Sequence, residues 1–124
     1  MIHQGTTSII IGYFYHVYNK LGYGFLEKVY ENALYLELIH NGLNCRKQVP
    51  ITVFYKENTV GDYYADLIVN DEIIIELKSA EGLREEHELQ LINYLKATKI
   101  EIGLLLNFGK KPEIKRKIFT NDKK

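Results

Sequence analysis

Two stretches near the start of the chain carry apolar residues at helical spacing. They cover Thr6–Asn19 and Phe25–Asn41, and each places its apolar side chains on one face of a helix. The glycines of Leu21–Gly24 separate the two stretches. Asn41 and Gly42 then supply residues that readily adopt the left-handed conformation in which many helices end. The pattern therefore predicts two consecutive helices.

The middle of the chain changes to the alternation of apolar and polar residues that is typical of β-strands. The pattern predicts strands at Lys47–Lys56, Tyr63–Val69 and Ile73–Lys78, with a turn over Lys56–Gly61. Glu85–Thr98 returns to helical spacing and predicts a third helix.

The last third of the chain contains one nearly continuous apolar run. Ile102–Phe108 is typical of a strand that is buried on both faces in the centre of a sheet. Glu113–Thr120 fits either a final edge strand or a frayed helix. The order α-α-β-β-β-α-β predicts an α+β or α/β fold with a mixed central sheet flanked by helices.

Length and charge narrow this picture. The chain has 124 residues, 46% of them hydrophobic, which fits one domain over residues 1–124 with a single core. Sixteen basic and sixteen acidic residues cancel, so the long-range attraction of a cationic protein for polyphosphate is missing. Basic residues are concentrated only in residues 110–124, which we interpret either as a solvated tail or as a phosphate-binding segment.

Cysteine content and hydropathy indicate the cellular compartment in which the protein is expected. Cys45 is the single cysteine, which excludes an internal disulfide, and no run approaches the roughly 20 apolar residues that span a bilayer. We therefore expect a cytoplasmic protein with no membrane partner. Six tyrosines are expected to be core residues, stacking surfaces for unpaired bases or part of a homodimer surface: Tyr13, Tyr15, Tyr18, Tyr23, Tyr63 and Tyr64.

Candidate chemistry comes from charges inside an apolar strand. Glu76 and Lys78 follow three isoleucines without a turn, and because they are two residues apart they share one face of the strand. Asp66 lies in the preceding strand, again among residues that read as buried. Unpaired buried carboxylates are costly, and a hard cation with oxygen ligands, Mg²⁺ or Mn²⁺, would relieve that cost. The sequence therefore predicts a metal site.

This site requires a particular strand register. A two-residue loop at Asn70-Asp71 would put Asp66 opposite Ile75, so that Asp66 and Glu76 would lie on different faces. A three-residue loop or a bulge would put Asp66 directly across from Glu76. The metal hypothesis therefore predicts one of the latter two arrangements.

These residues resemble a known family. Asp66 followed by Glu76-Leu77-Lys78 is similar to the signature of the PD-(D/E)XK nuclease superfamily, although Ala65 stands where the superfamily name has proline. Two further segments resemble the GxxExxY family within that superfamily, namely Gly24-Phe-Leu-Glu27-Lys-Val-Tyr30 and Gly103-Leu-Leu-Leu-Asn-Phe-Gly109. Gln90-Leu-Ile-Asn-Tyr94 resembles the Gln-x-x-x-Tyr motif that follows the Glu-x-Lys strand in RecB-like and lambda-exonuclease-like members. The resemblance implies a restriction-endonuclease-like core.

The resemblance also implies roles at the metal. Asp66, Glu76 and the main-chain carbonyl of Leu77 would hold Mg²⁺ or Mn²⁺, and Lys78 would orient the attacking water and offset charge in the transition state. An ion pair between Lys78 and either carboxylate is the structural alternative. Glu27 would contact the metal directly or through water, unless it is a solvated helix charge.

Further residues are candidates for substrate contacts. Gln90 and Tyr94 are four residues apart on one helix and would face the metal together, with Gln90 positioning a water or a phosphate. Tyr94 reads equally well as a core residue. His87 is either a phosphate contact or an exposed helix residue, and Lys115 and Arg116 would add basic charge.

The function that these expectations support is metal-dependent hydrolysis of phosphodiester bonds in DNA or RNA. A neutral chain favours a short or single-stranded substrate over an extended duplex. The alternatives are an accessory domain that keeps the fold and binds nucleic acid or a protein without catalysis, and hydrolysis of another phosphodiester.

Overall fold

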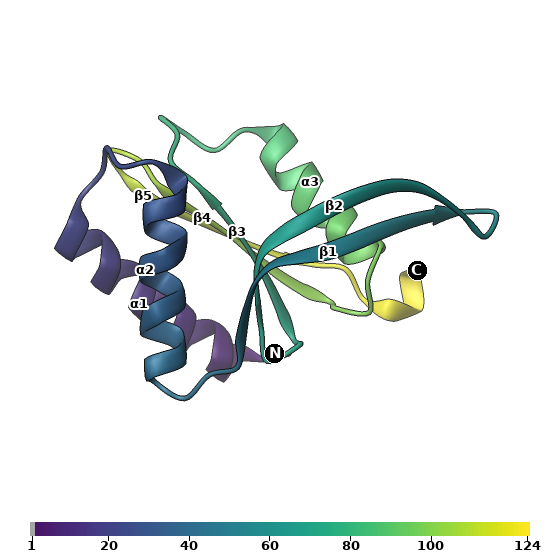
Figure 1. The fold of residues 1–124 in the computed structure, drawn as a ribbon, viewed down its shortest axis with the longest axis horizontal. Helices are drawn as coiled ribbons and strands as arrows, with labels where there is room; N and C mark the ends of the chain where they lie inside the picture. Colours follow the sequence, from purple (N-terminus) through teal and green to yellow (C-terminus); the bar gives the residue numbers. More distant parts are fainter. Residues whose placement is uncertain (1) are drawn as a thin grey trace.

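The computed structural model describes residues 2–124 and contains three helices and five strands (Figure 1). The helices are α1 (Gln4–Leu21), α2 (Glu27–His40) and α3 (Glu85–Lys96). The strands are β1 (Cys45–Tyr55), β2 (Asn58–Val69), β3 (Ile73–Lys78), β4 (Ile102–Phe108) and β5 (Pro112–Ile118), and a short 3₁₀ turn follows at Asn121–Lys123.

The five strands form one mixed sheet in the order β1-β2-β3-β4-β5. β3 and β4 are parallel and are connected through α3, whereas all other neighbours are antiparallel. This arrangement confirms the predicted α+β class with a mixed sheet flanked by helices. β4 is buried along its whole length, as its apolar run predicted.

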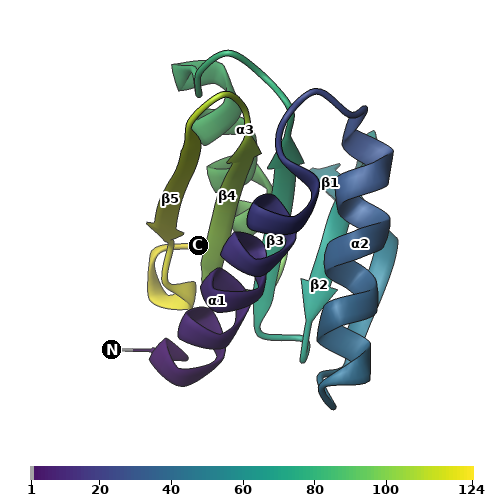
Figure 2. The same ribbon diagram turned by 90° about the vertical axis from the view of Figure 1, so that its left-hand side faces the viewer.

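The helices cover the two faces of the sheet. α1 and α2 pack on one face around Phe14, Tyr30 and Phe108, and α3 packs on the other face with Leu91 and Leu95 (Figure 2). The ring of Tyr30 stacks on that of Phe108 with their centroids 4.3 Å apart. Two apolar layers, one on each face of the sheet, therefore hold it in place. Within residues 2–124, no helix combines the length and hydrophobicity that a membrane crossing needs.

Several element ends differ from the predictions. The turn expected over Lys56–Gly61 is shorter, because Lys56 and Glu57 both have positive φ and form a two-residue turn that pairs Tyr55 with Asn58. The second helix begins at Glu27, not at Phe25. The segment that was left open between strand and frayed helix is an edge strand, since β5 pairs with β4 from Pro112 to Ile118.

Candidate metal centre at the fork between β2 and β3

The candidate site lies where β2 and β3 separate. The two strands pair only over Leu67–Val69, opposite Ile73–Ile75, and the rest of β2 continues past the sheet in a long hairpin with β1 (Figure 1). Val69 pairs with Ile73, so the loop contains the three residues that the metal hypothesis required. Continuing this register places Asp66 opposite Glu76 at the point where main-chain pairing ends.

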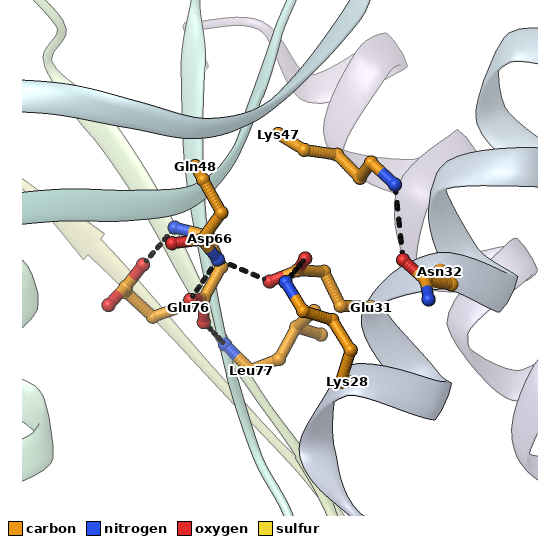
Figure 3. Close-up of polar contacts among 8 residues, drawn as sticks. All are labelled: Lys28, Glu31, Asn32, Lys47, Gln48, Asp66, Glu76 and Leu77. Carbon is orange, nitrogen blue, oxygen red and sulfur yellow. Dashed lines mark hydrogen bonds and ion pairs between the residues drawn. The ribbon is translucent and has the colours of Figure 1, made fainter.

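Asp66 and Glu76 replace the missing main-chain pairing with their side chains. The main-chain N–H of Asp66 donates to Glu76 Oε2 at 2.8 Å, and the N–H of Leu77 donates to Asp66 Oδ2 at 2.8 Å (Figure 3). Each carboxylate is therefore fixed through one oxygen by the neighbouring strand. The second oxygen of each remains for other contacts, and Asp66 Oδ1 lies 3.4 Å from the amide nitrogen of Gln48.

Burial dominates the electrostatics of this pair. Glu76 is 4% exposed, and burial together with the negative charge of Asp66 raises its pKa from 4.5 to about 8. Burial also raises the pKa of Asp66, and the charge of Glu31 adds to that effect. Lys78 acts in the opposite direction on both carboxylates but does not offset the burial. The site therefore lacks positive charge.

Lys78 is close enough to influence the two carboxylates without being paired to them. It lies two residues after Glu76 on β3 and is partly exposed. Within residues 2–124, no ion pair within 4.0 Å joins Lys78 to an acidic side chain. The alternative in which Lys78 only forms an ion pair with Asp66 or Glu76 is therefore not what this structure contains.

Glu31 and Gln48 belong to the site, although the sequence analysis did not select them. Glu31 is 4% exposed on α2, where it accepts hydrogen bonds from Lys28 Nζ at 2.8 Å and from Gln48 Nε2 at 2.6 Å (Figure 3). The Gln48 amide therefore bridges Glu31 and Asp66. Glu31 lies one helical turn after Glu27, a weak signal that could have identified it.

Glu27 does not complete a three-carboxylate group. It is the exposed first residue of α2, and its negative charge contributes to raising the pKa of Glu76. In the described part of the chain, no three Asp, Glu, His or Cys side chains are grouped closely enough to hold a metal ion. The direct contact expected for Glu27 is therefore not preformed, and a contact through water stays a prediction.

Tyr30, the tyrosine of the Gly-x-x-Glu-x-x-Tyr motif, positions the start of α2. Its buried hydroxyl donates to the carbonyl of Gly22 at 2.6 Å and accepts from the N–H of Phe25 at 3.2 Å. Gly24, in the same loop, has φ 110°, a conformation that favours glycine. The motif therefore fixes the loop that presents Glu27.

Gln90 and Tyr94 both line a groove whose lining residues do not include Asp66 or Glu76. Tyr94 is buried, and burial, with smaller contributions from the charges of Glu76 and Asp66, raises its pKa to about 12. Its ring packs 5.8 Å from that of Tyr63. Tyr94 is thus a core residue. No hydrogen bond within residues 2–124 joins Gln90 to Asp66 or Glu76, so its role there stays a prediction.

His87, Lys115 and Arg116 are separate from this cluster. His87 Nδ1 accepts the N–H of Arg84 at 3.1 Å and so caps the start of α3. Lys115 is exposed on the edge strand β5. Arg116 donates to the carbonyl of Ile2. The structure gives His87 and Arg116 local structural contacts, and it does not bring these three residues to Asp66 and Glu76.

Comparison with models of protein families shows the family to which this chain belongs. The model of the PD-(D/E)XK nuclease superfamily matches residues 4–117. The chain belongs to the PD-(D/E)XK nuclease superfamily. The match includes the three helices, strands β1 to β4 and β5 as far as Lys117, together with Asp66, Glu76 and Lys78. The family model is described as one of nucleases.

Comparison with solved structures supports the fold of this superfamily member. The crystal structure of SSO0001 matches with a TM-score of 0.61 at 20% sequence identity. The match covers 78% of this chain but only 52% of that one, so this chain spans about half the length of its structural relative. At this identity the likeness concerns the fold alone. No curated protein matches the sequence.

Proposed function

We propose that this chain is a Mg²⁺- or Mn²⁺-dependent nuclease that hydrolyses phosphodiester bonds in DNA or RNA. The observation that carries the proposal is the reciprocal pair at the fork. Asp66 and Glu76 are each fixed through one oxygen, while the ammonium group of Lys78 lies nearby without a carboxylate partner. Superfamily membership supports the same class of reaction.

The donor set fits a hard cation. The second oxygens of Asp66 and Glu76, that of Asp66 lying 3.4 Å from the Gln48 amide, would hold Mg²⁺ together with the main-chain carbonyl of Leu77. Mg²⁺ usually keeps several of its waters and needs few protein ligands. The buried Glu76 and the partly buried Asp66 both have raised pKa values, and a bound cation would favour their charged forms. When bound, the metal would polarise a phosphoryl oxygen and acidify a water molecule.

The remaining residues of the site would position the substrate and water. Lys78 would hold the attacking water near the phosphorus and offset charge that develops on the phosphoryl oxygens. Glu27 would act through water from the start of α2, and Gln90 would contact a phosphate or a water from α3. Gln48 and Glu31 would keep Asp66 in place.

Within the superfamily, we place the chain in the GxxExxY family. The proposal rests on Gly24, Glu27 and Tyr30, whose spacing the motif describes, and on the contacts through which Tyr30 positions the loop before α2.

Cleavage assays on single-stranded and duplex DNA and RNA, with Mg²⁺, Mn²⁺ or EDTA, test the proposed activity. We expect metal-dependent cleavage that falls at least about a hundredfold in Lys78→Met, because removing a transition-state charge contact costs on that order. Glu76→Gln should lose both cleavage and Mn²⁺ binding, the latter measured by calorimetry. Lys99→Met and Glu85→Gln, which change exposed charges elsewhere, are the matched controls.

Each result has a defined meaning. Cleavage that survives in both Lys78→Met and Glu76→Gln would place the active site elsewhere. If wild-type protein neither cleaves nor binds metal but still binds nucleic acid or a protein, the chain is the catalytically silent accessory domain considered as the alternative.

A further inference from the structure

A groove runs between the β1–β2 hairpin and α3. It has a volume of about 760 Å³ and contains Gln90 and Tyr94 in its α3 wall. Figure 1 shows the hairpin extending past the sheet alongside α3. β2 pairs with β3 only from Leu67 onward, so the earlier part of β2, which lines the groove, is separated from β3 by the same fork that forms the site.

The walls of the groove are made of flat and apolar side chains that face solvent. The hairpin supplies Phe54, which is 64% exposed, Val60 and Tyr63, and α3 supplies Leu89. The α3 side also carries the amides of Gln90 and Asn93, one helical turn apart. Clustered exposed apolar residues with a few polar groups mark a binding surface.

Charge limits what can occupy this groove. Its only charged lining residues are Glu86 and Lys96, which have opposite signs. A run of phosphates would find no excess of positive charge here, so the groove does not suit a duplex backbone. The flat, uncharged faces of nucleobases suit its aromatic walls, and base edges suit its amides.

The groove lies on the face of the sheet from which Glu76 projects. Ile74, two residues before Glu76 on β3 and therefore on the same face, belongs to the buried apolar cluster that contains Leu91 and Tyr94 of α3. Tyr94 also lines the groove, and its ring lies 5.8 Å from that of Tyr63 between centroids. A strand lying in the groove would therefore run along the sheet face that carries Glu76.

We propose that this groove holds unpaired bases of a single-stranded nucleic acid, stacked against Tyr63 and Phe54, while the adjoining phosphate lies at Asp66 and Glu76. The inference rests on the proposed nuclease function, since it names the substrate class of the same site. The strand would be recognised mainly through its bases, with few phosphate contacts.

Binding of fluorescent oligonucleotides, followed by anisotropy with Ca²⁺ in place of Mg²⁺, tests this inference. The probes are a short oligothymidylate, an oligouridylate, an abasic strand of the same length and a blunt duplex. We expect at least one of the first two to bind roughly tenfold or more tightly than the abasic strand and the duplex, because stacking a base on an aromatic ring has an effect of this order.

Neighbouring tyrosines provide a matched comparison. Tyr63→Ala should weaken binding of the preferred strand about tenfold, whereas Tyr64→Ala should not, because Tyr64 is similarly exposed but does not line the groove. Phe54→Ala, at an exposed position, should weaken binding in the same way and guards against a folding defect in Tyr63→Ala.

Equal affinities for the normal and abasic strands would overturn the inference, as would equal effects of Tyr63→Ala and Tyr64→Ala. Dissociation of a dimer by Phe54→Ala without any effect on the strands would instead make the groove an interface between copies. If cleavage occurs without base discrimination, only this inference fails. If base discrimination occurs without metal-dependent cleavage, the nuclease function fails and the groove assignment stands.

Discussion

At the scale of single residues, the side chains of Gln48 and Glu31 hold Asp66 in place. Gln48 has φ 49°, a left-handed conformation that is uncommon for a non-glycine residue, and its amide bridges Glu31 and Asp66. Without that amide, two acidic groups would face one another in a partly buried space. We infer that Gln48 is a positioning residue for the candidate metal ligand.

Gln48→Ala should therefore weaken Mn²⁺ binding by about tenfold or more, the usual cost of losing a group that orients a metal ligand. Calorimetric titration measures the effect. Lys47→Ala is the matched control, because Lys47 forms the neighbouring contact between β1 and α2, to Asn32, without touching Asp66. Equal affinities in the two variants would remove Gln48 from the site.

Glu76 makes the stability of the metal-free protein depend on pH. Its pKa rises from 4.5 to about 8 on folding, so the folded state retains a proton that the unfolded state has lost. The contribution of Glu76 to stability is therefore greatest below about pH 4.5. It falls as pH rises and levels off above about pH 8. The groups that act on Glu76 are Asp66, Glu27 and Lys78.

Glu76→Gln should stabilise the metal-free protein at pH 8 and flatten the loss of stability between pH 5 and pH 8, a range bounded by the two pKa values. Urea denaturation in EDTA at several pH values measures this. Asp66 retains a raised pKa, so part of the slope should remain. If the stability of Glu76→Gln changes with pH as steeply as that of the wild type, ionisation of the buried Glu76 does not destabilise the folded protein.

At the scale of elements, the loop after β3 is fixed by the end of β4. The buried amide of Asn107 accepts from the N–H of Ala80 at 2.9 Å and donates to the carbonyl of Ala80 at 3.0 Å and to Glu113 at 2.9 Å. Gly109 approaches the Ala80 carbonyl so closely that a Cβ there would collide with it. These contacts give a structural reason for the Asn and the final Gly in Gly103–Gly109.

Asn107→Ala should lower the free energy of unfolding by at least about 2 kcal/mol, because it removes a buried amide and leaves both partly buried main-chain groups of Ala80 without their partner. Urea denaturation measures the loss. Asn19→Ala, at an exposed position on α1, should change stability by less than about 0.5 kcal/mol. A loss for Asn107→Ala as small as that of the control would mean that the loop does not depend on this amide.

At the scale of the whole molecule, charge governs how a nucleic acid would be bound. Basic and acidic residues cancel, and the groove has one charge of each sign. Basic residues of β5 are engaged locally, since Lys117 pairs with Glu88 and Arg116 with the carbonyl of Ile2. Binding should therefore involve few phosphates.

The affinity for a single strand should fall only gently with salt, with a slope of log affinity against log salt of about −1 to −2, as expected for one to three neutralised phosphates. Anisotropy titrations over a range of salt concentrations measure the slope. A slope near −5, which about seven phosphate contacts would give, would contradict recognition mainly through bases.

The sequence by itself determined the elements and the central pair of the site. Local periodicity depends on neighbours along the chain, so the helices, the buried strand at Ile102–Phe108 and the class of fold were predictable. The period of two along a strand also meant that only a three-residue loop or a bulge would bring Asp66 to Glu76, and the loop has three residues.

Only the tertiary structure decided the surroundings of that pair. Glu31 and Gln48 come together because α2 packs against β1, and the left-handed conformation of Gln48 cannot be inferred from an alternating pattern that points Gln48 away from the core. Pro112–Ile118 forms a strand because it pairs with the edge of β4 that β3 does not occupy, and the sequence does not show that this edge is available. The groove exists because β2 and β3 separate. How far two strands stay paired depends on tertiary packing and cannot be inferred from the local sequence.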